Sequence, residues 1–271
     1  MSALSDYLEN KWDEHLLKNT AYTKPTTLYL GLFTADPGES GVTNELALGT
    51  GAYARAAITN NNVNFPQCAV SGTPTKTNAT VFQFPIATLA WGSITHWAIY
   101  DDDGSPAGNM LLHGAFAVTR YVAAGDAPKV AAGAVSFTIT NATSGGPTAY
   151  TQRKLLDHTF GGPDFTPPAT VYLGLGTALS GESLTEWDTD SGYARQAAAF
   201  DAASGGIIVN ADSEVFTTNI LAGPYTLNSF GVWDDPTAGN LLITGPVTTS
   251  RTVNTGDVAS IPDGGFTLTA Q

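Results

Sequence analysis

One sequence pattern occurs twice in the chain. Residues 27–40 read TLYLGLFTADPGES, and residues 170–183 read TVYLGLGTALSGES, 143 residues further on. Four more blocks recur in the same order: Gly51–Arg55 with Ser191–Arg195, Thr95–Asp102 with Asn228–Asp235, Ala107–Gly114 with Ala238–Gly245, and Thr119–Asp126 with Ser250–Asp257. Each copy has the size of an ordinary globular domain and is far longer than a solenoid repeat. We therefore expect two tandem domains, residues 1–143 and 144–271, joined by a flexible linker of small residues at 141–147.

Each copy opens with a helical pattern. Leu4, Leu8 and Trp12 recur every fourth residue within the segment Leu4–Leu17, and Ser5 is a suitable N-cap. Tyr150–His158 occupies the same place in the second copy. The histidines His15 and His158 align near the two helix ends, where a positive charge is favoured, so we expect them to have structural roles.

The remainder of each copy has the pattern of short strands. Runs rich in β-branched and aromatic residues are separated by Gly, Pro, Asn and Asp. In the first copy these runs are Leu28–Phe33, Tyr53–Ile58, Thr80–Phe84, Ile94–Tyr100, Met110–Val118 and Val135–Thr140. In the second they are Val171–Leu175, Tyr193–Phe200, Glu214–Thr217, Leu227–Trp233, Leu241–Val247 and Phe266–Thr269. Because no helices are interleaved, we predict an all-β fold of two tandem antiparallel β-sandwich or jelly-roll domains, each with a short N-terminal helix.

Net charge and composition limit the classes of partner that the chain is expected to bind. The net charge is −13, about −4 on the first copy and about −9 on the second, which argues against nucleic-acid binding. Only 13% of residues are charged, and such a surface suits contact with other proteins. No apolar run is long enough to cross a bilayer, and the first residues lack the pattern of a secretory signal. The single cysteine, Cys68, excludes an internal disulfide and is expected to be a small buried hydrophobe.

The sequence contains no recognisable catalytic motif. A nucleophile elbow, a phosphate-binding loop and paired zinc ligands are all absent. His96 and His113 become Ser229 and Thr244 in the second copy, which weakens both as site residues. The acidic run Asp101–Gly104 lacks the alternating ligands of a calcium loop and is expected to form a hairpin turn. We therefore predict no catalytic residue, no cofactor and no metal.

Six residues are candidates for contact with a partner: Leu4, Leu8, Trp12, Arg55, Trp187 and Arg195. The apolar stripe of the first helix either packs on its own sandwich or extends to a neighbour. The arginines each follow Tyr-Ala in both copies, and they either pin a loop within the domain or anchor an interface. Trp187 lies between turn signals and is expected to be an exposed aromatic contact, whereas Trp97 and Trp233 lie in strand patterns and are expected in the core.

The first copy also carries a family resemblance. The segments that carry it are the opening Leu4–Asn10 helix, Asn19–Tyr29, Phe33–Gly38, Tyr53–Arg55, Trp91–Trp97 and Gly108–Leu112. Together they resemble a family of tailed-bacteriophage virion proteins that are often labelled tail-fibre-like, and single-copy relatives are similar to small β-sandwich cement proteins of phage heads. The second copy departs from the pattern, since Pro224 and Tyr225 replace Trp91 and Gly92.

The resemblance implies a non-enzymatic virion protein. We expect a capsid decoration, or cement, protein on the outer capsid surface that binds the major capsid protein and neighbouring virion proteins and bridges capsomers. Self-association is open, and neither nucleic acid nor membrane is an expected partner. The alternatives are a tail or tail-fibre component, and a module that binds host polysaccharide through an exposed Trp187.

Overall fold

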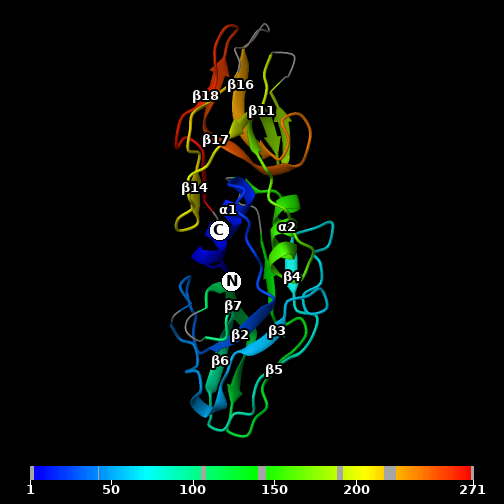
Figure 1. Ribbon diagram of the computed structural model, residues 1–271, viewed down its shortest axis with the longest axis vertical. Coiled ribbons are helices and arrows are strands. Elements are labelled where there is room, and N and C mark those ends of the chain that lie inside the picture. Colours follow the sequence, from blue (N-terminus) through cyan, green and yellow to red (C-terminus); the bar gives the residue numbers. More distant parts are fainter. Residues whose placement is uncertain are drawn as a thin grey trace.

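The computed structural model describes residues 3–41, 43–104, 108–139, 145–187, 192–216 and 224–269. The molecule is elongated, with a lobe of strands at each end and two helices, α1 (Asp6–Leu17) and α2 (Ala149–Thr159), between them (Figure 1). Strands β1–β9 form the first lobe and β10–β19 form the second. The predicted all-β fold with one short helix per copy is confirmed.

The two lobes have the same topology. The main antiparallel sheet of the first lobe has the order β1 (Ala3–Leu4), β7 (Met110–Val122), β6 (Gly92–Tyr100), β2 (Thr27–Phe33), β3 (Ala56–Thr59). Two short ribbons accompany it: β4 (Thr75–Thr77) with β9 (Ser136–Thr138), and β5 (Phe82–Gln83) with β8 (Lys129–Val130).

The second lobe repeats this arrangement with one additional strand in its main sheet. Its main sheet has the order β10 (Gly146–Pro147), β17 (Leu241–Val253), β16 (Tyr225–Trp233), β11 (Val171–Ser180), β12 (Ser183–Glu186), and β13 (Gln196–Ala198) also pairs with β11. The ribbons are β14 (Ile207–Val209) with β19 (Thr267–Thr269), and β15 (Glu214–Val215) with β18 (Ser260–Ile261). The tandem duplication read from the sequence therefore corresponds to two equivalent sandwiches.

Each core lies between the main sheet and the ribbons. In the first lobe, Leu28 and Leu30 of β2 pack in one cluster with Phe82 and Phe137 from the ribbons, and all four are at most 5% exposed. Alternate residues of the sheet strands point into this layer, as expected for a half-buried sheet. The matching cluster of the second lobe includes Leu173 of β11.

Both helices begin at a capped residue beside an edge strand. The Leu8 amide donates to Ser5 Oγ over 3.2 Å, so the predicted cap is confirmed, and Thr148 occupies the equivalent position before α2. Part of the predicted linker is in fact ordered strand, because Gly146 pairs with Thr244 in β10–β17, as Ala3 pairs with His113 in β1–β7. The linker prediction was wrong here since only composition, and not strand pairing, is visible in a Gly-Gly-Pro sequence.

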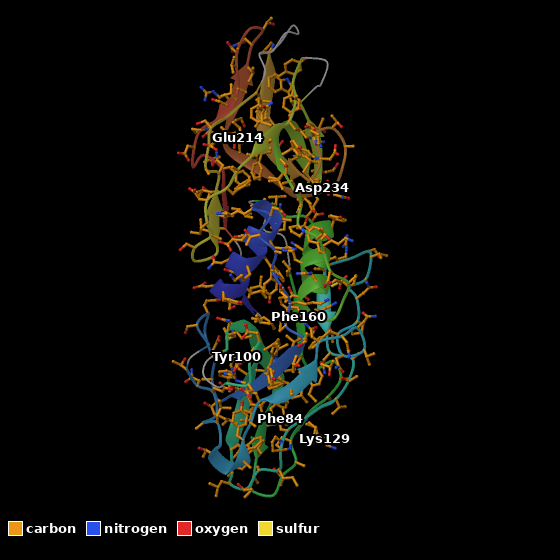
Figure 2. The ribbon with its side chains drawn as sticks, viewed as in Figure 1. Phe84, Tyr100, Lys129, Phe160, Glu214 and Asp234 are labelled. Carbon is orange, nitrogen blue, oxygen red and sulfur yellow. The ribbon has the colours of Figure 1, made fainter. Side chains whose placement is uncertain are left out.

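The two helices are shared between the lobes. α1 lies against β7 of the first lobe and β14 of the second, whereas α2 lies against β17 of the second and β4 of the first. Leu16 and Leu17 of α1 belong to the second core. Leu155, Leu156 and Phe160, which the second copy contributes, belong to the first core. In Figure 2, Phe160 lies on the first-lobe side of the molecule, far from Glu214 and Asp234 in the second lobe.

This exchange changes what the sequence suggested about the domains. The predicted boundary between residues 143 and 144 lies outside the described residues and stays a prediction. Each copy supplies its own sheets, but neither core is complete without residues from the other copy's helix region. The chain is therefore one continuous body with two sandwiches rather than two independent domains joined by a flexible linker.

Candidate functional site

The repeated Tyr-Ala-Arg sequence forms a buried polar network in each lobe. In the first lobe, Arg55 Nε and Nη2 each donate to the Glu45 carboxylate over 2.8 Å, and Nη1 donates to the Asp102 carbonyl over 3.0 Å. Tyr53 Oη donates to Glu45 Oε1 and accepts from the Leu32 amide. Although burial lowers the pKa of the guanidinium, its hydrogen bonds to Glu45 raise the pKa of Arg55 above its ordinary value. The network ties two loops to strand β2.

The second lobe has the same network. Arg195 makes two 2.9 Å bonds to the Glu186 carboxylate, and its Nη1 donates to the carbonyls of Asp235 and Ala238. Tyr193 Oη accepts from the Leu175 amide and donates to Glu186. Arg195 also stacks over Trp233 at 3.9 Å from the ring centroid, as Arg55 stacks over Tyr100 at 3.4 Å.

These networks explain why Leu-Gly-Leu recurs in both copies. A Cβ on Gly31 would lie 2.9 Å from Glu45 Oε1, and one on Gly174 would lie 2.5 Å from Tyr193 Oη. Only glycine leaves room there for the buried carboxylate and phenol. Sequence reasoning found the arginines but missed Glu45 and Glu186, whose signal is an acid seven or eight residues before the tyrosine in both copies.

The predicted contact residues are therefore mostly internal. The guanidinium side chains of Arg55 and Arg195 are 7% and 10% exposed and hold loops, so the internal alternative is the one the contacts support. The apolar stripe packs on its own molecule, because Leu4, Leu8 and Trp12 are at most 5% exposed within the first core. The alternative in which this helix extends to a neighbour was wrong for this chain.

The expectation of an exposed Trp187 was also wrong. Its side chain is 1% exposed and packs on Tyr193 and Tyr225, with ring centroids 5.3 and 6.1 Å away. The Trp187 amide donates to the Leu175 carbonyl, so the residue continues the β11–β12 pairing instead of lying in a loop. Its acidic neighbours concealed this alternation in the sequence. Trp97 and Trp233 are buried as expected, at 1% and 6% exposure.

A second polar cluster lies at the junction between the helices and lobes. Lys76 of β4, 2% exposed at its side chain, contacts Asp157 of α2 at 2.5 Å. Trp12 Nε1 donates to Thr159 Oγ1 over 2.8 Å. On the side of α1 that faces the second lobe, burial raises the pKa of Asp13 to about 8 and that of Glu9 to about 7. The junction therefore joins the two copies through a buried ion pair on the α2 side and buried carboxyl groups on the α1 side.

The histidines His15 and His158 occupy the centre of this junction. Their rings stack with centroids 4.7 Å apart and an interplanar angle of 14°. The Tyr22 amide donates to His15 Nδ1 while the Tyr22 carbonyl contacts His158 Nε2, and Phe165 makes the reciprocal pair of bonds. The structural role expected from the sequence holds, but the positive charge does not, because burial lowers the pKa of both rings.

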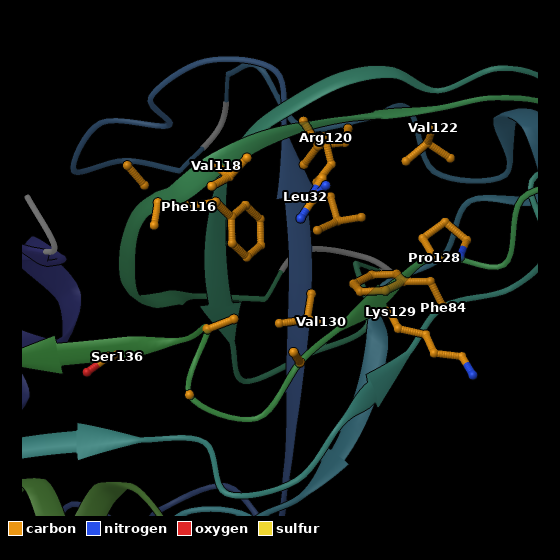
Figure 3. A pocket seen from close by; sticks show the side chains of 16 residues that line it. Leu32, Phe84, Phe116, Val118, Arg120, Val122, Pro128, Lys129, Val130 and Ser136 are labelled. Carbon is orange, nitrogen blue, oxygen red and sulfur yellow. The ribbon is translucent and has the colours of Figure 1, made fainter.

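Each lobe also has an open groove between its main sheet and its ribbons. The groove of the first lobe, about 480 Å³, is lined by Leu32, Phe84 and Phe116 among others, with Arg120 and Lys129 as its charged lining residues. Figure 3 shows the Phe116 ring and Leu32 facing the groove, while the Lys129 ammonium points away. The second-lobe groove, about 470 Å³, lies at the equivalent place, and its lining residues carry no charge.

A long bulge borders each groove. Ile94 pairs with Arg120 and His96 pairs with Ala115, so residues 116–119 lie opposite Thr95 alone. The second lobe repeats this with residues 247–250 opposite Asn228. Since β1 covers only the start of β7, the rest of that edge is open, and a bulge is a common way to blunt such an edge against further strand pairing. The bulges therefore make the open edges of β7 and β17 poorly suited to further strand pairing.

The acidic hairpins behave as turns. Asp101 accepts hydrogen bonds from the Asn109 amide and side chain, and Asp234 does the same with Asn240. Within the part of the chain that the structure describes, no group of three or more His, Cys, Asp or Glu side chains is placed to hold a metal ion. None of the helices described is long and apolar enough to span a bilayer. Cys68 is buried, and burial raises the pKa of its thiol to about 11.

These features define the class of the protein as a tandem-duplicated β-sandwich whose repeated residues maintain its structure. The family described as podophage GP4 fiber I protein gp80 matches residues 3–138 and again residues 146–269. The chain belongs to this family, and it is thus a bacteriophage virion structural protein that contains the family's domain twice. The family resemblance and the duplication predicted from the sequence are confirmed. The comparison with curated proteins finds no match.

Proposed function

We propose that the chain is a non-enzymatic component of a fibre on the phage particle, where it acts as a rigid two-lobed spacer and adaptor. The observation that carries this is the shared helical junction, which makes an elongated molecule of two equivalent sandwiches into one body (Figure 1). Such a body keeps the contacts at its two ends at a fixed distance and orientation, whereas lobes on a flexible linker would not. The description of the matching family as a fibre protein agrees with this role.

The partners we propose are other virion proteins, which would contact the lobes at the open grooves. These surfaces carry little charge, so their contact with protein requires little desolvation of ions. The major capsid protein is a partner only in the alternative in which the two lobes decorate the shell and bridge capsomers. The burial of Trp187 removes the residue on which the polysaccharide-binding alternative was based.

Quantitative mass spectrometry of purified virions tests the proposal, with the major capsid protein as the internal standard. A few to a few dozen copies per particle, together with gold-labelled antibody at the tail or at fibres, would support a fibre component. Copies in the hundreds with label over the whole head would overturn it in favour of capsid decoration. Absence from the particle would contradict both.

A further inference from the structure

The histidine pair His15–His158 closes a ring of four hydrogen bonds that joins both halves of the chain. Tyr22 and Phe165, at equivalent positions after the two helices, each use their amide on one ring and their carbonyl on the other. All four distances lie between 2.8 and 3.1 Å. Because each imidazole contacts segments from both copies, the pair connects α1, α2 and the segments that precede β2 and β11 at one point.

This geometry fixes the protonation state of both rings. A backbone amide can only donate, so Nδ1 of each ring must accept and cannot carry a proton. A backbone carbonyl can only accept, so Nε2 must carry the proton. Both rings are therefore neutral Nε2–H tautomers. A proton added to either Nδ1 would face an amide N–H, and it would place a cation 4.7 Å from the other stacked ring.

We propose that the stacked His15–His158 pair is an acid-sensitive switch. Protonation of either imidazole breaks the closed set of four hydrogen bonds and lets the two lobes change their relative orientation. The proton enters at Nδ1, the Tyr22 or Phe165 amide loses its acceptor, and the stacked rings separate. This property goes beyond the proposed structural role and does not depend on where on the particle the chain lies.

The charged groups around the pair shape this response. Asp164 lies 3.7 Å from His158 Nδ1 and favours protonation of that ring, while Lys24, paired to Asp164 at 2.8 Å, opposes it. On the other side of α1, Glu9 and Asp13 face the second lobe and are buried as neutral acids below their raised pKa values. Asp13 is already mostly neutral at pH 7.5, and Glu9 becomes neutral as the pH falls through about 7. Acid therefore loosens the α1–α2 contact without adding charge to the contact of α1 with the second lobe.

The sign of the effect follows from burial. Burial lowers the pKa of both rings, so the His15–His158 pair binds fewer protons in the folded chain than in the unfolded chain. The contribution of the pair to stability is complete above the ordinary histidine pKa of about 6.5 and is lost as the pH falls below that value. We expect the lobes to hold one orientation at pH 7.5 and to move as the pH approaches 5.

Two measurements on the full chain test the switch. Imidazole nitrogen NMR should show Nε2–H tautomers at pH 7.5 for both rings. Energy transfer between dyes at Val70→Cys and Val258→Cys, in a Cys68→Ser background, should change between pH 7.5 and 5; both valines are exposed, at 92% and 53%, one in each lobe. The chain with His15→Gln and His158→Gln should lose this pH response, whereas His96→Gln, a control outside the junction, should keep it.

Several outcomes would overturn the proposal. One is an Nδ1–H tautomer or a charged ring at pH 7.5. Another is protonation of the pair with no change in energy transfer. A third is a pH response that survives in the double-glutamine chain. Because the NMR measurement uses the native rings, the proposal stays testable even if the double variant fails to fold.

Discussion

Truncation of Leu156 tests the claim that the second copy's helix completes the first core. Leu156 is fully buried in the first-lobe cluster although it lies in α2. A Leu→Ala change at such a site costs about 2–5 kcal/mol. If lobe opening carries this cost, the open population should rise about 30- to 4,000-fold, since about 1.4 kcal/mol is a factor of ten.

Hydrogen exchange followed by mass spectrometry locates the effect. In Leu156→Ala, peptides of β2, β3 and β5 in the first lobe should exchange faster by this factor. The matched control is Leu173→Ala, which removes an equally buried side chain from the second core and should act first on β11 and β16. The reasoning is refuted if Leu156→Ala leaves the first lobe exchanging at the native rate and accelerates only the second.

Three further predictions concern buried polar and aromatic groups. Because the pKa of Asp13 is raised to about 8, folding retains a proton that the unfolded chain releases, and unfolding free energy should fall as the pH rises. Asp13→Asn should remove up to about 1.4 kcal/mol per pH unit of that slope between pH 5 and 7, measured by urea unfolding; an unchanged slope would contradict the assignment. Trp187→Ala should cost about 3–5 kcal/mol and lower the melting temperature, and native stability in this variant would show that the side chain is not in the core. Arg195→Lys keeps the positive charge but loses the paired hydrogen bonds to Glu186, so it should lower the free energy of chemical unfolding by about 1.5–3 kcal/mol. The control Arg153→Lys, on the surface of α2, should leave that free energy nearly unchanged. Equal effects of the two substitutions would refute the special role of the network.

Local pattern was sufficient for the elements whose side chains alternate plainly. The helix Asp6–Leu17, its Ser5 cap and the long strands around Leu30 and Trp97 follow from periodicity and turn residues. Short pairings were missed, such as β4 and β14, because two or three residues carry no periodic signal. Strand β7 extends to Val122, beyond the predicted end, since a bulge interrupts its alternation.

The candidate site was predicted less well than the fold. Repetition correctly marked Arg55 and Arg195 as special, but their carboxylate partners lie across a loop whose length differs between the copies. Trp187 was misread because acidic residues around it suggested exposure, whereas the β11–β12 hairpin turns its ring into the core. The grooves could not be foreseen, since they depend on how β7 and the ribbons lie in space.

The sequence by itself determined the duplication, the all-β class and the family, because these depend on order and local periodicity along the chain. Only the tertiary structure decided that the helices are shared between the two cores and that His15 stacks on His158. Each copy's pattern is compatible with a helix packed on its own sheets or on its neighbour's. The choice depends on which apolar surfaces lie against each helix in the folded chain, and that information exists only in three dimensions.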